Sequence, residues 1–135
     1  MTTPEVELAV NGTLMRGLEL NSHLTDIGGA FLRAARTEPL YRLWSIDDRH
    51  PAMIRTTADD GTGVAVELWR VPASGLAELL LREPGGLSIG KVRLDTGEEV
   101  LGVLAEPALV EGQREITTYG GWRAYLASLT DAHRP

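Results

Sequence analysis

The stretch with the clearest chemical potential is a short apolar strand that runs into a glycine-bracketed turn, residues 10–17 (VNGTLMRG). A strand that ends at a glycine leaves successive backbone N–H groups without a ladder partner, and such groups form a shallow cup that can bind an anion. The turn therefore predicts the floor of an active or binding site, the alternative being an ordinary strand-to-loop connection. The residues predicted to bind there are Asn11, Gly12, Thr13 and Leu14, with the Thr13 hydroxyl as a further donor.

Three polar side chains elsewhere could reach the same site. Tyr119 precedes the Gly120-Gly121 turn at the start of a predicted helix, where it could line the pocket or pack as a core aromatic. Arg123 could bind a carboxylate through a bidentate fork, or it could be an exposed helix arginine. His23 could face the pocket, or it could be a partly exposed histidine with a structural hydrogen bond.

Glu83 follows an apolar helical segment and precedes Pro84-Gly85-Gly86, which ends the helix. A solvated glutamate in the last turn of a helix is somewhat disfavoured by the helix dipole. A catalytic glutamate here should instead be partly buried, with its pKa raised towards neutrality by loss of solvation, because it must both accept and donate a proton. The residues alone leave both interpretations open.

Other sequence motifs of enzymes are absent or lie between the wrong secondary-structure elements. The sequence of residues 86–90 (GLSIG) satisfies G-x-S-x-G, but a nucleophile elbow needs a strand before the serine and a helix after it, and the predicted order is the reverse. Three scattered histidines and no cysteine give no metal-ligand spacing, so we predict no metal and no thiolate nucleophile. Phosphate-binding and dinucleotide fingerprints are absent, and we predict no cofactor.

Bulk properties narrow the class of partner. A length of 135 residues predicts a single domain, residues 1–135, with a substantial core. The net charge of −6 disfavours nucleic acid, which leaves small molecules and proteins as partners. No apolar run approaches the roughly 20 residues that span a bilayer, and no secretory signal is visible, so we expect no membrane association and a cytoplasmic location.

Hydrophobic periodicity predicts an α+β chain. Strands are expected at 5–10, 30–36, 40–46, 51–55, 64–71, 89–94 and 98–105, and short helices at 20–26, 74–83 and 121–130. Asn21, Ser22 and Ser74 are expected to cap helices, and residues 131–135 to fray. Because the helices interrupt the strands irregularly, we predict a small mixed or antiparallel β-barrel of about six or seven strands with short helices packed outside.

Several blocks of the chain carry a family resemblance. They are residues 12–17 (GTLMRG) with 21–24 (NSHL), 41–44 (YRLW) with 51–53 (PAM), 64–71 (VAVELWRV), 87–92 (LSIGKV) and 116–126 (ITTYGGWRAYL). Together they resemble the gamma-glutamylcyclotransferase-like superfamily, and within it most closely the C-terminal domain of allophanate hydrolase, here standing alone.

The resemblance implies a mixed barrel whose N-terminal turn holds a substrate carboxylate through the N–H groups of Gly12, Thr13 and Leu14. In cyclotransferases it implies a general acid and base at the end of the central helix, which by position is Glu83. In the allophanate hydrolase domain it implies decarboxylation of N-carboxycarbamate, the product of a partner amidase domain.

The sequence departs from both patterns. Asn11 stands where the superfamily usually has an aromatic residue, and Thr13 where the allophanate hydrolase domain usually has histidine. Glu83 stands where that domain generally lacks a carboxylate. We therefore expect a small-molecule enzyme acting on a compact carboxylated amide or carbamate of urea or allophanate metabolism. The alternatives are a gamma-glutamylcyclotransferase that releases 5-oxoproline from γ-glutamyl amines and a non-catalytic accessory domain that binds an amidase.

Overall fold

The computed structural model describes residues 4–59 and 62–132, and it confirms an α+β fold with short helices. The strands are β1 (Glu5–Val10), β2 (Ala30–Arg36), β3 (Tyr41–Ile46), β4 (His50–Arg55), β5 (Ala65–Pro72), β6 (Leu87–Arg93), β7 (Glu99–Ala105) and β8 (Arg114–Glu115). The helices are α1 (Asn21–Asp26), α2 (Leu76–Arg82) and α3 (Trp122–Ala132). Short 3₁₀ turns lie at Ala73–Gly75, Pro107–Val110 and Thr117–Tyr119.

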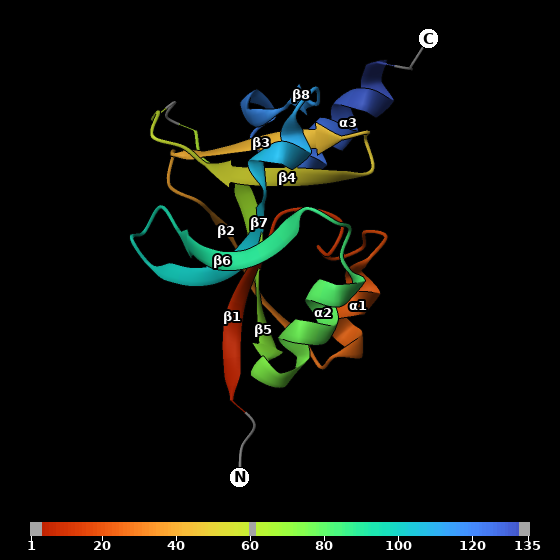
Figure 1. The fold of residues 1–135 in the computed structure, drawn as a ribbon, viewed down its shortest axis with the longest axis vertical. Helices are drawn as coiled ribbons and strands as arrows, with labels where there is room; N and C mark the ends of the chain where they lie inside the picture. The colour runs from red at the N-terminus through yellow and green to blue at the C-terminus, as the bar shows by residue number, and fades with distance from the viewer. Residues whose placement is uncertain (1–3, 60–61, 133–135) are drawn as a thin grey trace.

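Five strands form a mixed sheet in the order β2-β5-β1-β7-β6 (Figure 1). β1 lies in its centre, antiparallel to β5 and parallel to β7. The period-2 alternation of β1 and the apolar run of β5 predict strands that bury one or both faces. Leu8 and Leu68 are accordingly buried completely.

The sheet curls until its two edge strands meet at one end. Thr37, just after β2, and Leu94, just after β6, form an antiparallel bridge. On either side of it, the Glu38 N–H donates to the Arg93 carbonyl at 3.1 Å and the Asp95 N–H donates to the Arg36 carbonyl at 2.9 Å. The expected barrel is thus a curled sheet joined at one corner, and not a single closed ring of strands.

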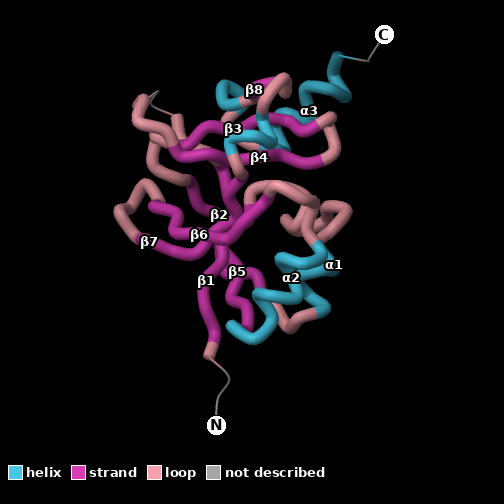
Figure 2. The backbone as a smooth tube through the Cα atoms, in the orientation of Figure 1, coloured by secondary structure: helices cyan, strands magenta, loops and turns pink. Residues whose placement is uncertain are grey.

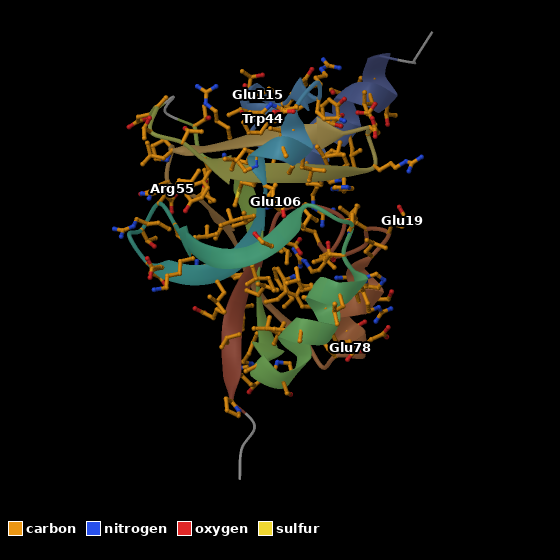
Figure 3. The ribbon with its side chains drawn as sticks, viewed as in Figure 1. Glu19, Trp44, Arg55, Glu78, Glu106 and Glu115 are labelled. Carbon is orange, nitrogen blue, oxygen red and sulfur yellow. The ribbon has the colours of Figure 1, made fainter. Side chains whose placement is uncertain are left out.

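A second, antiparallel sheet with the order β4-β3-β8 lies across one end of the first (Figure 2). Its two-residue strand β8 was not predicted, and it brings Glu115 opposite Trp44 (Figure 3). One hydrophobic cluster joins both sheets and α3. Its members from the second sheet and α3 include Tyr41, Leu43, Met53, Trp122 and Tyr125.

α1 and α2 lie side by side and are joined by an Arg82–Asp26 ion pair at 3.4 Å (Figure 1). The predicted caps are wrong, because no side-chain cap bond forms at α1 or α2. Asn21 and Ser22 lie inside α1, and Ser74 lies in the 3₁₀ turn before α2. Of the segment expected to fray, Asp131 belongs to α3 and 133–135 lie outside the described residues. No helix in the described ranges is long and apolar enough to span a membrane.

The turn after β1 depends on close contact with β4. A Cβ atom added to Gly12 would lie 2.3 Å from Cδ of Pro51 and 2.4 Å from its Cγ. Atoms do not approach so closely, so any side chain at this position would force the turn and β4 apart. Gly12 is therefore required for packing.

We expect Gly12→Ala to lower the free energy of unfolding by about 1–3 kcal/mol, the usual effect of an overpacked contact. Gly85→Ala is the matched control, because a Cβ there meets nothing within 4 Å. It should change stability by less than about 0.5 kcal/mol. Urea denaturation of both variants measures the difference, and equal stabilities would show that the turn and β4 can separate freely.

Candidate functional site

The N-terminal turn, the end of α2 and the start of β4 meet at a narrow cavity. It is lined by Val10, Asn11, Gly12, Thr13, Leu14, His50, Pro51, Glu83, Leu87 and Val103. Its free space is about 20 Å³, enough for about one water molecule. Glu83 and the predicted anion-binding turn, about seventy residues apart in sequence, therefore share one cavity.

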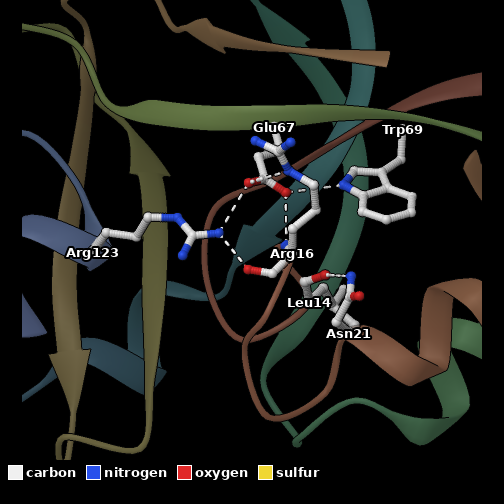
Figure 4. A network of polar contacts seen from close by, with 6 residues as sticks. All are labelled: Leu14, Arg16, Asn21, Glu67, Trp69 and Arg123. Carbon is white, nitrogen blue, oxygen red and sulfur yellow. Dashed lines mark hydrogen bonds and ion pairs between the residues drawn. The ribbon is translucent and has the colours of Figure 1, made fainter. Parts of the chain in front are cut away.

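The turn is held through its carbonyl groups. The Gly12 carbonyl accepts from the Met15 N–H at 2.9 Å, and the Thr13 carbonyl accepts from the Leu20 N–H at 2.9 Å. The Leu14 carbonyl accepts from Nδ2 of Asn21 at 2.8 Å (Figure 4).

The N–H groups of the turn are free by contrast. Within residues 4–59 and 62–132, those of Gly12, Thr13 and Leu14 donate to no backbone or side-chain acceptor. Unpaired donors next to a cavity favour an anion, because an anion supplies the acceptors that the protein does not.

Asn11 has a structural role at the same cavity. Its side chain is buried, and its Nδ2 donates to the Val103 carbonyl at 3.1 Å and lies 3.7 Å from Sδ of Met53. These contacts tie the end of β1 to β7 and β4. The side-chain amide nitrogen is thus already occupied.

Glu83 is the first residue after α2, in an extended conformation with φ −77° and ψ 155°. Its Oε1 atom is buried and has no hydrogen-bond partner among the described residues. Loss of solvation raises the pKa of this carboxyl from 4.5 to about 7. A glutamate with such a pKa can act either as an acid or as a base near neutral pH.

His50 lines the same cavity as Glu83, and its role was not predicted from the sequence. Its Nδ1 lies 3.1 Å from the Pro51 carbonyl. A proton on Nδ1 satisfies this contact and leaves Nε2 available as an acceptor. His50 and Thr13 also line a wider outer basin of about 580 Å³, which includes Glu19 on the loop before α1 (Figure 3).

The β3–β4 hairpin positions His50. Asp47 and Asp48 at its tip have positive φ angles of 53° and 58°, which glycine adopts freely and which, among other residues, a short polar side chain tolerates best. The carboxylate of Asp48 is fixed by the Ser45 hydroxyl at 2.7 Å and by the Tyr125 hydroxyl of α3 at 2.6 Å. α3 therefore supports the cavity without lining it.

Three residues predicted from the sequence lie elsewhere. Tyr119 and Arg123 line a separate hollow that faces Met15 and Arg16, on the other side of the turn. His23 is absent from the lining of the cavity, and its buried Nδ1 has no partner in the described part of the chain. The prediction that these side chains join Glu83 is therefore not supported by the geometry.

Glu67 was not predicted from the sequence. It is a buried carboxylate on β5 with only 4% of its surface exposed (Figure 4). It accepts hydrogen bonds from the Arg16 N–H at 2.9 Å, from Nε1 of Trp69 at 3.1 Å and from Nη2 of Arg123 at 3.0 Å. Burial opposes its ionisation, but these bonds outweigh that effect and lower its pKa below 4.5. An acidic residue inside the apolar run of β5 was the signal that could have revealed it.

No group of three or more histidine, aspartate or glutamate side chains that could hold a metal occurs in the described ranges. Besides the Asn11 amide, the polar groups of the cavity are free N–H donors, one hydroxyl, one imidazole and one carboxyl. This set is suited to binding a small anion and moving a proton.

The fold is similar to that of gamma-glutamylcyclotransferase-like proteins. A solved structure titled gamma-glutamyl cyclotransferase superposes with a TM-score of 0.53 over 76% of this chain and 68% of that chain, at 17% identity. Residues 6–127 match the allophanate hydrolase C-terminal domain family, and the chain belongs to that family.

Relatives agree with this assignment. A protein described as specific to uropathogenic E. coli is 58% identical, with a TM-score of 0.89 over 94% of this chain and 98% of that chain. Kluyveromyces lactis allophanate hydrolase is 26% identical, with a TM-score of 0.88 over 93% of this chain and 22% of that chain. Urea amidolyase of Saccharomyces cerevisiae is 29% identical over 92% of this chain, which spans only 7% of that protein.

We expect Glu67→Gln to lower the free energy of unfolding by about 2–3 kcal/mol at neutral pH, because the charge that holds Arg16 and Arg123 is removed. A glutamate whose pKa is lower in the folded state than its unfolded value of about 4.5 stabilises the fold at a pH above 4.5. This stabilisation is lost as the pH falls through the folded pKa. The difference from the parent should therefore shrink in acid. Urea denaturation across this range measures it.

Glu98→Gln, which removes an exposed ion pair with Arg33, is the control and should have little effect. A constant penalty for Glu67→Gln at every pH would contradict an electrostatic role for Glu67.

Glu83→Gln should raise stability. A carboxyl whose folded pKa is about 7 against 4.5 in the unfolded chain destabilises the fold progressively as the pH rises between those values. We expect Glu83→Gln to be more stable than the parent by about 1–3 kcal/mol above pH 7, and the gain to vanish below pH 4.5. The matched control is Glu78→Gln on the exposed side of the same helix (Figure 3). No pH-dependent gain would mean that Glu83 is solvated.

Proposed function

We propose that this protein is a small-molecule enzyme that decarboxylates a compact carbamate such as N-carboxycarbamate. The observation that carries the proposal is the buried, unpaired Oε1 atom of Glu83 in the cavity lined by the turn with free N–H groups. Anion donors and a proton carrier in one place are the minimum that such a reaction requires.

In the proposed reaction, one carboxylate of the substrate binds the N–H groups of Gly12, Thr13 and Leu14. The C–N bond to the other carboxyl carbon breaks, and that carbon leaves as CO₂. The electron pair of the bond stays on nitrogen, which takes a proton from the neutral carboxyl of Glu83. Carbamate and the Glu83 carboxylate remain, and solvent returns the proton to Glu83.

His50 is proposed to steady the substrate. An imidazole with Nδ1 held by the Pro51 carbonyl can bind a further oxygen of the substrate through Nε2 when it is protonated. In this proposal, His50 on β4 provides the imidazole that the family usually carries at the position of Thr13. The narrow cavity has room for only about one water molecule, so the proposal places most of the substrate in the wider basin, which shares Thr13 and His50 with the cavity.

Two alternatives each have one observation in their favour. Glu83 favours γ-glutamyl cyclotransfer, because a carboxyl with a pKa of about 7 can take the proton of the attacking amine and return it to the leaving amine. The small volume of the cavity favours a non-catalytic domain that binds an amidase. The relatives named urea amidolyase and allophanate hydrolase, of which this chain spans a small part, are consistent with an amidase partner.

The pH dependence of turnover separates the two reactions. If Glu83 must be protonated to donate, kcat/KM for CO₂ release falls as the pH rises through about 7. If it must first accept a proton, kcat/KM for 5-oxoproline release from γ-glutamyl amines falls as the pH drops through the same value. To measure CO₂ release, an excess of a separately purified amidase produces N-carboxycarbamate from allophanate in the assay. The rate of spontaneous decarboxylation is then subtracted.

Glu83→Gln should reduce the active reaction by about 10²–10⁴-fold, the usual contribution of general acid–base catalysis. Glu78→Gln should leave it unchanged. Neither product above background, together with amidase binding that Glu83→Gln does not alter, would favour the accessory domain and overturn the proposed enzyme.

A further inference from the structure

A second hollow lies behind the turn. Gly12, Thr13 and Leu14 line the narrow cavity, whereas Met15 and Arg16 line this hollow. Its other walls come from β2, β5 and the beginning of α3. It has a volume of about 310 Å³, which lies in the range of small-molecule sites.

The inner wall of this hollow is apolar and built from small side chains. Ala35, Ala65 and Val66 come from the neighbouring strands β2 and β5, and Trp122 from the start of α3. Val66 and Trp122 are buried. Small residues beside a buried aromatic leave room for the apolar body of a ligand.

Three arginines surround this apolar surface. The guanidinium of Arg16 lies 3.5 Å from the centre of the Phe31 ring, which holds it flat. The side chains of Arg16 and Arg123 remain 54% and 48% exposed. Among the described residues, Glu67 is the only carboxylate in the lining of the hollow, and it already accepts bonds from both. Among the described lining residues, the three arginines outnumber the single carboxylate, and the hollow therefore carries an excess of positive charge.

Arg36 is the arginine best able to turn towards a ligand. Its Nη1 atom contacts the carbonyls of Thr62, Gly63 and Gly120 at 3.3–3.5 Å. These distances are long for hydrogen bonds, so little is lost when the side chain moves. Within the described ranges the other two side-chain nitrogens of Arg36, Nε and Nη2, have no hydrogen-bond partner.

We propose that this hollow is a binding site for a small organic carboxylate with an apolar body, distinct from the cavity of Glu83. The guanidinium groups bind the carboxylate through paired N–H donors, which match its planar geometry. The apolar body lies against the wall formed by the small residues of β2 and β5. This use explains why Tyr119 and Arg123 lie away from Glu83.

Benzoate is the probe, and its neutral isostere benzamide is the comparison. In a ¹H–¹⁵N NMR titration, benzoate should shift the amide signals of Arg16, Ala35, Gly121 and Ala124, with a Kd on the order of 1 mM. The signals of Gly12, Thr13 and Leu14 should move less. Benzamide, which lacks the charge, and acetate, which lacks the ring, should both bind more weakly.

Two variants test the assignment. Arg36→Gln should weaken benzoate binding by about tenfold, as expected when a charged hydrogen-bond donor is lost. Its matched control is Arg33→Gln on the same strand, which pairs with Glu98 and does not line the hollow. Ala34→Phe fills the hollow from an exposed position and should abolish binding while the folded spectrum is retained.

Each result decides the proposal. The proposal is supported by shifts around the hollow that require both the charge and the ring of the probe, that Arg36→Gln weakens and that Ala34→Phe abolishes. Shifts confined to residues 12–14, equal affinity for benzamide or acetate, or unchanged binding by Arg36→Gln would overturn it. Glu83→Gln should bind benzoate normally, so that loss of catalysis and loss of this site are distinguished.

Discussion

The buried carboxylate of Glu67 is the contact on which the arrangement of both hollows depends. It draws the Arg16 backbone, the Trp69 indole and the Arg123 guanidinium to one point on β5. Arg123 in turn donates to the Arg16 carbonyl at 2.6 Å. A charge in the interior is tolerable only when it is fully hydrogen-bonded, so the segments that supply the donors must stay in place. The turn after β1 is thereby fixed against both the sheet and α3.

The opposite condition holds at Glu83. Its buried oxygen has no partner, and the N–H groups of the neighbouring turn are also free. Unpaired polar groups destabilise a fold and persist where a ligand completes their bonding. The contrast between a satisfied carboxylate on β5 and an unsatisfied one after α2 separates a structural role from a candidate chemical one.

Much of the fold could be predicted because its signals are local. The alternation of residues 5–10, the apolar run of 64–71 and the glycines after α2 mark strands and a helix end without reference to the rest of the chain. The caps were wrong because Asn21 bonds to the turn carbonyl of Leu14 instead of to its own helix. The strand β8 was missed because two residues carry no periodicity.

The sequence by itself determined the strand and helix types, the glycine turn and the presence of an acid directly after α2. Only the tertiary structure decided which side chains meet. Glu83 and His50 line the cavity on one side of the turn, and Tyr119 and Arg123 line the hollow on the other. Local patterns cannot report this, because the distances between elements are set by packing among residues far apart in the chain.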